Sequence, residues 1–255
     1  MTKLDKFVRN TSLIIAGGLI AASGAQAACV GTCGTSGADG VVSLSPLGAY
    51  SYITTNGGIS GVGSLGIGGE VNGSEFSTST FTAGSGASLN FYFNYVTSDG
   101  AGFSDYAWAQ LRSSTGVVAT LFSARTTASG DVVPGFGLPA LTATLTPVHT
   151  PIIDGGPVWS PLGESSGSCF DAGCGYTGWI GAQYTIARAG DYSLVFGVTN
   201  NQDESFDTGL AFTGVTIDGT PVPTGGVPEP ATWAMMIVGF VMVGSVRRRR
   251  TNVLA

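Results

Sequence analysis

The clearest pattern along the chain is an alternation of apolar and polar residues with a period of two. It runs through residues 89–95, 192–198 and, less regularly, 210–217. In a β-strand such an alternation places all the apolar side chains on one face. These three segments are therefore predicted to be strands that each contribute one face to a core.

Three further features extend this prediction. The segments 106–111 and 117–122 flank a short Ser-, Thr- and Gly-containing stretch that is typical of a hairpin turn. Residues 176–186 form another expected strand. Residues 104–112 are the one stretch that could instead be helical, and no long amphipathic helix is expected between residues 28 and 227.

Many short strands joined by Gly-rich turns indicate an all-β fold, and we expect a jelly-roll-like sandwich of two sheets over residues 28–219. Residues 34–88 are rich in Gly, Ser and Thr, so they are expected to supply the first strands and long loops. Residues 89–219 should hold the denser part of the core. The Pro- and Gly-containing residues 220–227 are expected to be a stiff, polar linker.

The first 27 residues have the three parts of a secretory signal peptide. Basic residues Lys3, Lys6 and Arg9 precede an apolar run at 13–20, and Ala25-Gln26-Ala27 is a small-x-small cleavage site. The mature chain would then begin at Ala28.

Two alternatives to this interpretation are a membrane anchor or buried helix, and a lipoprotein attached at Cys29. The apolar run is short for a membrane span. Gln26 fits poorly at the apolar position that lipid attachment at Cys29 would require. A cleaved signal peptide is the preferred interpretation.

The other end of the chain combines a motif, an apolar run and a block of arginines. Pro228-Glu229-Pro230 precedes 16 uncharged residues from Ala231 to Val246, with Trp233 near their start, and Arg247, Arg248, Arg249 and Arg250 follow. As a helix these 16 residues would reach ~24 Å, against a hydrocarbon layer of ~30 Å. The arginines should stay in the cytoplasm, which would place residues 28–227 on the far side of the inner membrane.

This tripartite arrangement resembles the PEP-CTERM sorting signal of exported bacterial proteins, over residues 228–255. The resemblance implies an exported cell-surface or extracellular protein, held transiently in the membrane by the C-terminal helix until an exosortase-type protease cuts near the motif. Proteins with this signal often accompany exopolysaccharide and biofilm genes. The alternative is a plain single-span anchor whose prolines only start a helix.

The run from Leu89 to Gly219 is also similar to an uncharacterised β domain of other PEP-CTERM proteins. Four segments carry this similarity: 95–100, 105–108, 133–137 and 173–179. It implies an exported β-sandwich and transfers no catalytic residues.

The charge distribution excludes one class of partner. Between residues 28 and 227, three arginines stand against 14 acidic residues, a net charge of −11. Binding to nucleic acid requires clustered Lys and Arg side chains. A nucleic-acid partner is therefore not expected.

Four cysteines in an exported chain predict disulfide bonds. The preferred pairs are Cys29–Cys33 and Cys169–Cys174, because each closes a short local loop. A zinc site is the alternative, but the spacing matches no familiar zinc pattern.

Two motif matches are rejected on their context. Residues 163–167 match the Gly-x-Ser-x-Gly hydrolase pattern, but the flanking residues predict no strand-to-helix turn, and His149, the single histidine, comes earlier in the chain. Residues 61–66 match a dinucleotide-binding fingerprint without the helix that it needs.

Two groups of residues are candidates for binding. Asp203, Glu204 and Asp207 could offer oxygen ligands to calcium, although their spacing is not that of an EF-hand and a solvated turn is the simpler interpretation. Trp159, Tyr176 and Trp179 flank the expected Cys169–Cys174 loop, and their flat rings could stack on sugars or pack in the interior.

These observations predict a non-catalytic surface or matrix protein that could bind exopolysaccharide, with no cofactor. A secreted glycoside hydrolase or other hydrolase is an alternative, since two carboxylates are enough for glycoside cleavage. A structural coat subunit is a second alternative. The carboxylates available for hydrolysis are Asp99, Asp105, Asp131, Asp154 and Asp171.

Overall fold

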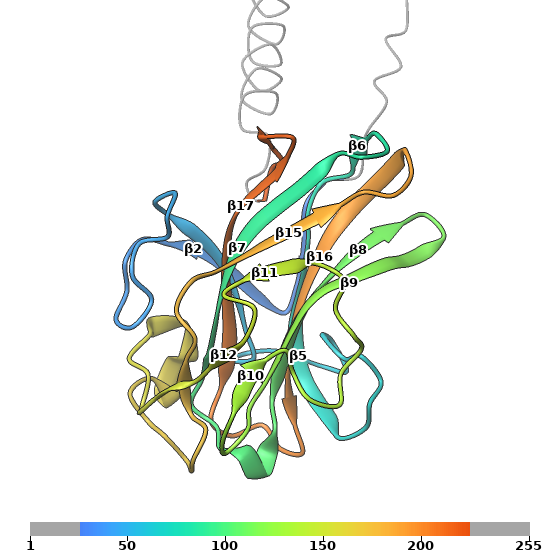
Figure 1. The fold of residues 1–255 in the computed structure, drawn as a ribbon. Coiled ribbons are helices and arrows are strands. Elements are labelled where there is room, and N and C mark those ends of the chain that lie inside the picture. Colours follow the sequence, from blue (N-terminus) through green and yellow to red (C-terminus); the bar gives the residue numbers. More distant parts are fainter. Residues whose placement is uncertain (1–25, 225–255) are drawn as a thin grey trace, which may run out of the picture.

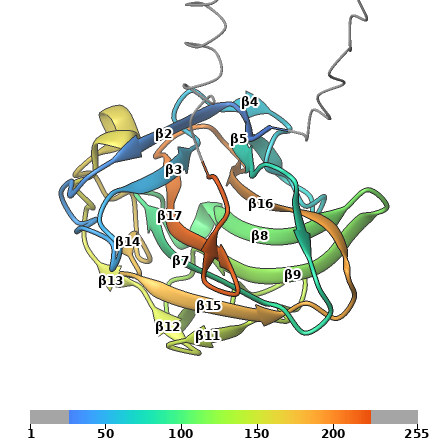
Figure 2. The same ribbon diagram turned by 90° about the horizontal axis from the view of Figure 1, so that it is seen from above.

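The computed structural model describes residues 26–224, which form two antiparallel β-sheets packed face to face (Figures 1 and 2). The predicted signal peptide, apart from Gln26 and Ala27, lies outside the described residues. So do the sorting motif Pro228-Glu229-Pro230, the apolar run from Ala231 to Val246 and the arginines that follow it.

The first sheet has seven strands, five of them in the order β1-β5-β16-β8-β9. Two short strands, β4 and β6, pair with β5 and β16. The strands of this sheet are β1 (Ala28–Val30), β4 (Ile59–Ser60), β5 (Glu70–Ser77), β6 (Phe81–Ala83), β8 (Tyr106–Ser113), β9 (Gly116–Arg125) and β16 (Gly190–Asn201).

The second sheet has nine strands, six of them in the order β11-β15-β7-β17-β3-β2, with short strands at its margins. Its strands are β2 (Thr32–Ser36), β3 (Tyr50–Thr54), β7 (Ser88–Thr97), β11 (Thr144–Thr146), β13 (Ile153–Asp154), β14 (Gly175–Tyr176), β15 (Ile180–Thr185), β17 (Thr208–Ile217) and β18 (Thr220–Pro221). A separate pair is formed by β10 (Asp131–Val133) and β12 (Thr150–Pro151), and the two 3-10 helices are η1 (Ala101–Phe103) and η2 (Ser160–Ser165).

The core lies between the two sheets and is rich in phenylalanine. Phe93 of β7 stacks on Phe122 of β9 with ring centroids 3.8 Å apart, and Phe196 of β16 stacks on Phe212 of β17 at 3.9 Å. Each pair joins one sheet to the other, and such pairs add about 0.5–1.5 kcal/mol beyond the burial of their area. The inward-facing residues are those that the period-two pattern selects.

The structure confirms the strands predicted from that pattern. Residues 89–95, 192–198 and 210–217 lie in β7, β16 and β17. The expected hairpin is β8–β9, in which Ser113 pairs with Gly116 around a two-residue turn. The possible helix at 104–112 does not form: these residues belong mainly to β8, whose inner face joins the core.

The β-structure continues past residue 219 into the first residues of the predicted linker. Thr220 and Pro221 form β18, which pairs with the end of β17, and the Val222 side chain is buried in the core. The connecting Asp218 and Gly219 both have positive φ, as a two-residue hairpin turn requires. The Asp218-Gly219 dipeptide is a typical hairpin signal, but the prolines that follow it favoured the prediction of a linker.

Both ends of the described chain lie at the same end of the sandwich, the top in Figure 1. There β1 pairs Ala28 with Ser77, and the carbonyl oxygen of Thr224 accepts a hydrogen bond from Ser51 Oγ. The opposite end carries η1 and the loop between β16 and β17. Thr224, the last described residue, therefore lies at the end of the sandwich opposite this loop.

Candidate functional site

The three aromatic residues predicted as a binding platform belong to one cluster on the outer face of the second sheet, but they are not equally accessible. Trp159 is 0 % exposed, so its ring cannot stack on a ligand. Its indole Nε1 donates a hydrogen bond of 3.0 Å to the hydroxyl of Tyr50. Tyr176 and Trp179 are partly buried against the same cluster. For Trp159, interior packing is the correct interpretation.

Trp179 lines a groove of about 360 Å³ on this outer face. The groove runs over β7, β15 and β11, and no charged side chain of residues 26–224 lines it. Its walls consist of aromatic rings, side-chain amides and hydroxyl groups, together with Pro46 and Gly181. The side chains that line it include Asn90, Tyr92, Thr144, Thr146, Trp179 and Gln183.

The depth of the groove comes from a glycine between two larger neighbours. Gly181 of β15 pairs with Tyr92 of β7 on one side and with Thr146 of β11 on the other. A Cβ atom at Gly181 would lie 3.4 Å from Cε1 of the Tyr92 ring. On the other flank of the ring, Gly214 of β17 also lacks a side chain, and the Leu47 side chain lies against it. The partly buried Tyr92 ring therefore faces the groove on the side of Gly181.

The next row of paired residues supplies hydrogen-bonding groups. Gln183 pairs with Asn90 on one side and with Thr144 on the other. The amide nitrogens of Asn90 and Gln183 both donate to Ser88 Oγ, at 3.1 and 3.2 Å. Within residues 26–224, neither amide oxygen has a hydrogen-bond donor, so both can accept hydrogen bonds from a ligand.

Trp179 is held in place from behind. Its Nε1 donates a hydrogen bond of 3.2 Å to the carbonyl oxygen of Ser43, and its ring meets the edge of Tyr50 with centroids 5.6 Å apart. Tyr50 is in turn fixed by Trp159. Trp159 and Tyr176 therefore have supporting roles. Trp159 holds Trp179 in place through Tyr50, and Tyr176 packs beside them.

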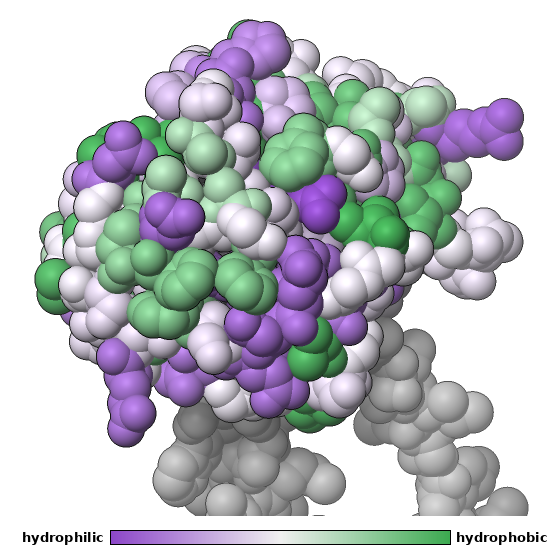
Figure 3. Space-filling model, turned by 90° about the horizontal axis from the view of Figure 1, so that it is seen from below, coloured by the Kyte–Doolittle hydropathy of each residue, from purple (hydrophilic) through white to green (hydrophobic). Residues whose placement is uncertain are grey.

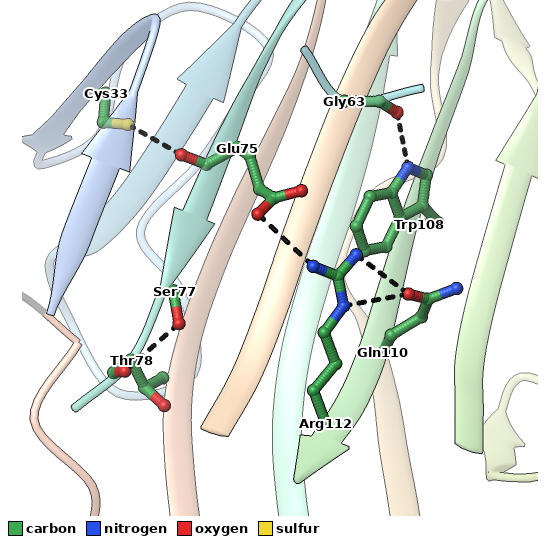
Figure 4. Close-up of polar contacts among 8 residues, drawn as sticks. All are labelled: Cys33, Gly63, Glu75, Ser77, Thr78, Trp108, Gln110 and Arg112. Atoms are coloured by element: carbon green, nitrogen blue, oxygen red, sulfur yellow. Dashed lines mark hydrogen bonds and ion pairs between the residues drawn. The ribbon is translucent and has the colours of Figure 1, made fainter. Parts of the chain in front are cut away.

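The outer face of the first sheet is closed by comparison. The Trp108 ring lies against Gly197 of the neighbouring strand, and its Nε1 donates a 2.7 Å hydrogen bond to Gly63 O (Figure 4). Arg112 stacks over the ring at 5.1 Å, bonds Gln110 and forms an ion pair with Glu75 at 3.5 Å (Figure 4). Trp108 is 0 % exposed. This face offers no comparable aromatic surface.

The carboxylates proposed for hydrolysis do not gather in one cleft. Asp154 and Asp171 are exposed, and Asp131 pairs with His149 at 3.2 Å. Asp105 is completely buried, where it accepts hydrogen bonds from Thr208 Oγ1 and the Asn201 amide. Burial raises the pKa of Asp105 well above its usual value, and these two hydrogen bonds only partly oppose the effect.

Asp99, the fifth carboxylate proposed for hydrolysis, lines a separate pocket together with Asp203. Burial raises its pKa to about 7; the Gly100 amide opposes this shift and the nearby charge of Asp203 adds to it. Sequence reasoning named both residues, but in different roles, because no local pattern shows that the loops carrying them meet.

The two rejected motifs have structural roles. In residues 163–167, the hydroxyl of Ser165 bonds the carboxylate of Asp207 at 3.2 Å, and His149 pairs elsewhere. Residues 61–66 form the loop that accepts the Trp108 hydrogen bond, and no helix follows them.

Two of the residues predicted as calcium ligands form hydrogen bonds with different partners within the protein. Asp207 accepts a hydrogen bond from Thr55 Oγ1 at 2.9 Å, and Asp203 accepts one from the Ser205 amide at 2.8 Å. Glu204 is exposed. Across residues 26–224, no group of three His, Cys, Asp or Glu side chains is arranged to hold a metal ion.

Both predicted disulfide bonds, Cys29–Cys33 and Cys169–Cys174, are present. The first joins β1 of one sheet to β2 of the other. The second closes the loop that carries Phe170. The described part of the chain contains no free cysteine.

In the portion covered by the structure, no helix has the length and apolar character that crossing a bilayer requires. The predicted membrane helix, from Ala231 to Val246, lies outside that portion.

Comparison with known proteins identifies the C-terminal signal. No curated protein matches the chain in sequence. Among solved structures, the K1 cleaved adhesin domain of Lys-gingipain from Porphyromonas gingivalis W83 aligns over 78 % of this chain and 91 % of its own, with 9 % identity and a TM-score of 0.32, which is too low to define fold or function. Residues 226–250 match the model of the PEP-CTERM protein-sorting motif. The predicted resemblance is confirmed: this chain carries a PEP-CTERM sorting motif.

Proposed function

We propose that this protein is exported, sorted by an exosortase-type protease, and retained at the cell surface or in the extracellular matrix, where it binds exopolysaccharide without catalysing a reaction. The match at residues 226–250 supports the sorting step. The N-terminal signal peptide and the span from Ala231 to Val246 are the sequence features that would deliver the β domain across the inner membrane and hold it there before processing.

The observation that carries the binding function is the uncharged groove over β7, β15 and β11. Its volume of about 360 Å³ falls within the usual range for ligand sites, roughly 300–1,000 Å³. Tyr92 and Trp179 offer aromatic surface to the apolar faces of sugar rings. Asn90 and Gln183 offer amide oxygens to sugar hydroxyl groups. Because the groove lacks charge, a neutral glycan is the ligand class that it suits.

The strand order provides a suitable framework for such a site. We infer that the eight long strands form a jelly roll, since β3-β17-β7-β15 and β5-β16-β8-β9 are the two interleaved four-stranded sheets of that fold. Jelly rolls occur in lectin domains. The groove lies on rigid strands rather than on loops, which keeps its aromatic and amide groups in place.

The test is binding of the full chain, in detergent, to exopolysaccharide extracted from the producing bacterium and to an array of neutral oligosaccharides. We expect binding that is lost in Tyr92→Ala. The control is Phe136→Ala, which removes a half-exposed aromatic ring that lies outside the groove. Absence of binding to every glycan, or equal loss in both variants, would overturn the proposed function.

The hydrolase alternative is less well supported by the geometry. A glycoside hydrolase needs two carboxyl groups on either side of a substrate cleft. Asp99 and Asp203 share a pocket, but its volume is only about 120 Å³. Release of reducing sugars from the extracted polysaccharide, abolished by Asp99→Asn, would favour hydrolysis over binding.

A structural coat subunit is favoured by one observation. The edge strand β9 exposes Val117 and Val118, and exposed apolar side chains on a sheet edge promote association between chains. Light scattering distinguishes this role: growth of assemblies with protein concentration, abolished by Val118→Lys, would support a coat, whereas a constant mass would support a monomeric binder.

A further inference from the structure

The end of the sandwich opposite Thr224 holds a second pocket, separate from the groove. Its volume is about 120 Å³, and its walls are Asp99, Phe103, Phe170, Asp203, Ser205 and Phe206. Figure 3 shows this end, where hydrophobic and strongly hydrophilic residues lie side by side. Two carboxylates in a small chamber of aromatic rings form an unusual combination for surface packing.

Three segments that are distant in sequence each contribute one ring. Phe103 comes from η1, Phe170 from the loop closed by Cys169–Cys174, and Phe206 from the loop between β16 and β17. The Phe170 ring lies 5.4 Å from Phe103 and 5.2 Å from Phe206. Phe170 is half-exposed, so the ring cluster is open to solvent rather than part of the core.

Hydrogen bonds between these segments fix the rings. The Phe170 amide donates to Ser98 O at 3.0 Å, the Ala101 amide to Ala172 O at 2.9 Å, and Gln202 Nε2 to Gly102 O at 2.7 Å. Phe206 has a φ of 58°, a left-handed conformation that is costly for a bulky residue and persists only where the surroundings impose it. The pocket is therefore formed before any ligand arrives.

The carboxylate of Asp99 lies in this pocket and lacks a charged partner. The residue is only 2 % exposed, and within residues 26–224 the only hydrogen bond to its carboxylate comes from the Gly100 amide to Oδ1, at 2.6 Å. The Asp203 carboxylate accepts a hydrogen bond from the Ser205 amide and from no other group that the structure describes. In residues 26–224, neither carboxylate forms an ion pair. A buried carboxylate without a counter-charge is costly, and a cationic ligand would remove that cost.

We propose that this pocket binds an organic ammonium group, such as the amine of an amino sugar or a small quaternary amine. Aromatic faces attract a cation through their negative quadrupole, and the carboxylates of Asp99 and Asp203 neutralise its charge. A neutral ligand would leave both charges uncompensated. The volume admits one ammonium group with its nearest carbon atoms. The inference does not depend on the groove or on its glycan.

The test is an NMR titration of the full chain in detergent, which follows the amide signals of Gly100 and Ser205. The probes are tetramethylammonium, glucosamine and the neutral N-acetylglucosamine. We expect the two cationic probes to shift both signals and the neutral probe to leave them unchanged. A shift with glucosamine alone would assign the site to an amino sugar, and one with tetramethylammonium alone to a quaternary amine. Equal effects of charged and neutral probes, or none, would overturn the proposal.

Charge variants separate binding from folding. Asp203→Asn should weaken tetramethylammonium binding by about ten-fold, equivalent to the loss of one favourable charge contact. The matched control, Asp191→Asn, removes an exposed carboxylate outside the pocket that bonds Thr82, and should leave the affinity unchanged. Equal affinity in wild type and Asp203→Asn would contradict the assignment even if Asp99→Asn failed to fold.

The pH dependence gives an independent readout. Asp99 faces Asp203 and the buried Asp105, and burial raises its pKa to about 7. Tetramethylammonium does not titrate, so its binding should tighten about ten-fold from pH 6 to pH 8 as Asp99 ionises. Affinity that is constant across this range would exclude Asp99 from the site.

Discussion

On the outer face of each sheet an aromatic ring lies beside a glycine of the neighbouring strand, but only one of the two rings is fully buried. On the first sheet Trp108 lies against the paired Gly197, and on the second sheet Tyr92 lies beside the paired Gly181. In both, a glycine faces the aromatic ring of the neighbouring strand, but a Cβ atom would clash with the ring only at Gly197. Trp108 is fully buried, whereas Tyr92 remains partly exposed in a groove.

What differs is the loop above each ring. On the first sheet, the chain around Gly63 and Leu65 crosses over Trp108 and is pinned by two hydrogen bonds of 2.8 Å, from the Leu65 amide to the Tyr106 hydroxyl and from that hydroxyl to Glu70. Beside Tyr92, Leu47 lies next to Gly214 and Pro46 lines the groove, but within residues 26–224 this segment leaves Tyr92 partly exposed. The comparison indicates that a loop held over the ring buries an aromatic residue beside a glycine, whereas a loop that only flanks the ring leaves a groove.

The largest expected effect comes from removing the rings of Trp108 and Tyr92. Trp108→Ala should lower the free energy of unfolding by about 3–5 kcal/mol, as for other buried aromatic residues. Tyr92→Ala should cost about 1 kcal/mol or less, because little of its environment depends on the ring. Urea unfolding of both variants measures these values, and similar losses in the two would remove the distinction between a packed face and an open one.

The next test removes the Tyr106 hydroxyl, whose hydrogen bonds hold the loop that covers Trp108. Tyr106→Phe should cost about 1–3 kcal/mol, because the Glu70 carboxylate loses a donor and the Leu65 amide loses its acceptor. Burial opposes ionisation of Glu70, but the hydrogen bonds from Tyr106 and the Ile67 and Gly68 amides outweigh it and lower the pKa to about 2.

The sign of the pH effect follows from that lowered pKa. The stabilisation from ionised Glu70 is complete above its ordinary pKa of about 4.5 and is lost as the pH falls toward 2. The deficit of Tyr106→Phe should therefore be full at pH 7 and smaller at pH 3. Thermal unfolding at the two pH values measures it, and a deficit that does not change with pH would show that Glu70 is not involved.

A smaller effect is expected for the cation above Trp108. Arg112→Ala should cost about 0.5–1.5 kcal/mol, because its stacking on the ring and its partly exposed ion pair with Glu75 are each modest. Arg112→Lys keeps the charge but loses the planar contact and the two bonds to Gln110. Equal stability of wild type and Arg112→Ala would mean that the loop alone closes this face.

The smallest effect on stability should come from filling the groove. Gly181 does not have a positive φ, and a Cβ atom there would make only ordinary contact with Tyr92. Gly181→Thr should change the free energy of unfolding by less than about 0.5 kcal/mol, since threonine suits a strand, yet it should abolish glycan binding. Chemical unfolding tests the effect on stability, and the glycan array tests the effect on binding. Retained glycan binding by Gly181→Thr would place the ligand outside the groove.

The sequence predicted the strands that carry the core because each inward face follows a period of two, as in Leu89, Phe91 and Phe93. Both disulfide bonds were predictable because each closes a short loop. The sorting motif was predictable from Pro228-Glu229-Pro230 and the arginines after it. These are local signals, and each can be read without knowing what lies nearby in space.

The binding surfaces were predictable only in part. Trp159 and Trp179 were predicted together as part of one aromatic platform, but Trp179 lines the groove whereas Trp159 is fully buried against Tyr50 from a distant strand. The role of Gly181 depends on register with Tyr92 and Thr146, which no local pattern reveals. The pocket of Asp99 and Asp203 joins three loops, so sequence separation concealed it.

Glycan binding by Gly181→Thr and wild type, measured side by side on polysaccharide extracted from the producing bacterium, tests the central claim most directly. The open face of the second sheet should bind in the wild type, and the variant should lose binding while keeping its unfolding midpoint. Equal binding by the two proteins would contradict the claim that the groove between Tyr92 and Thr146 is the functional site.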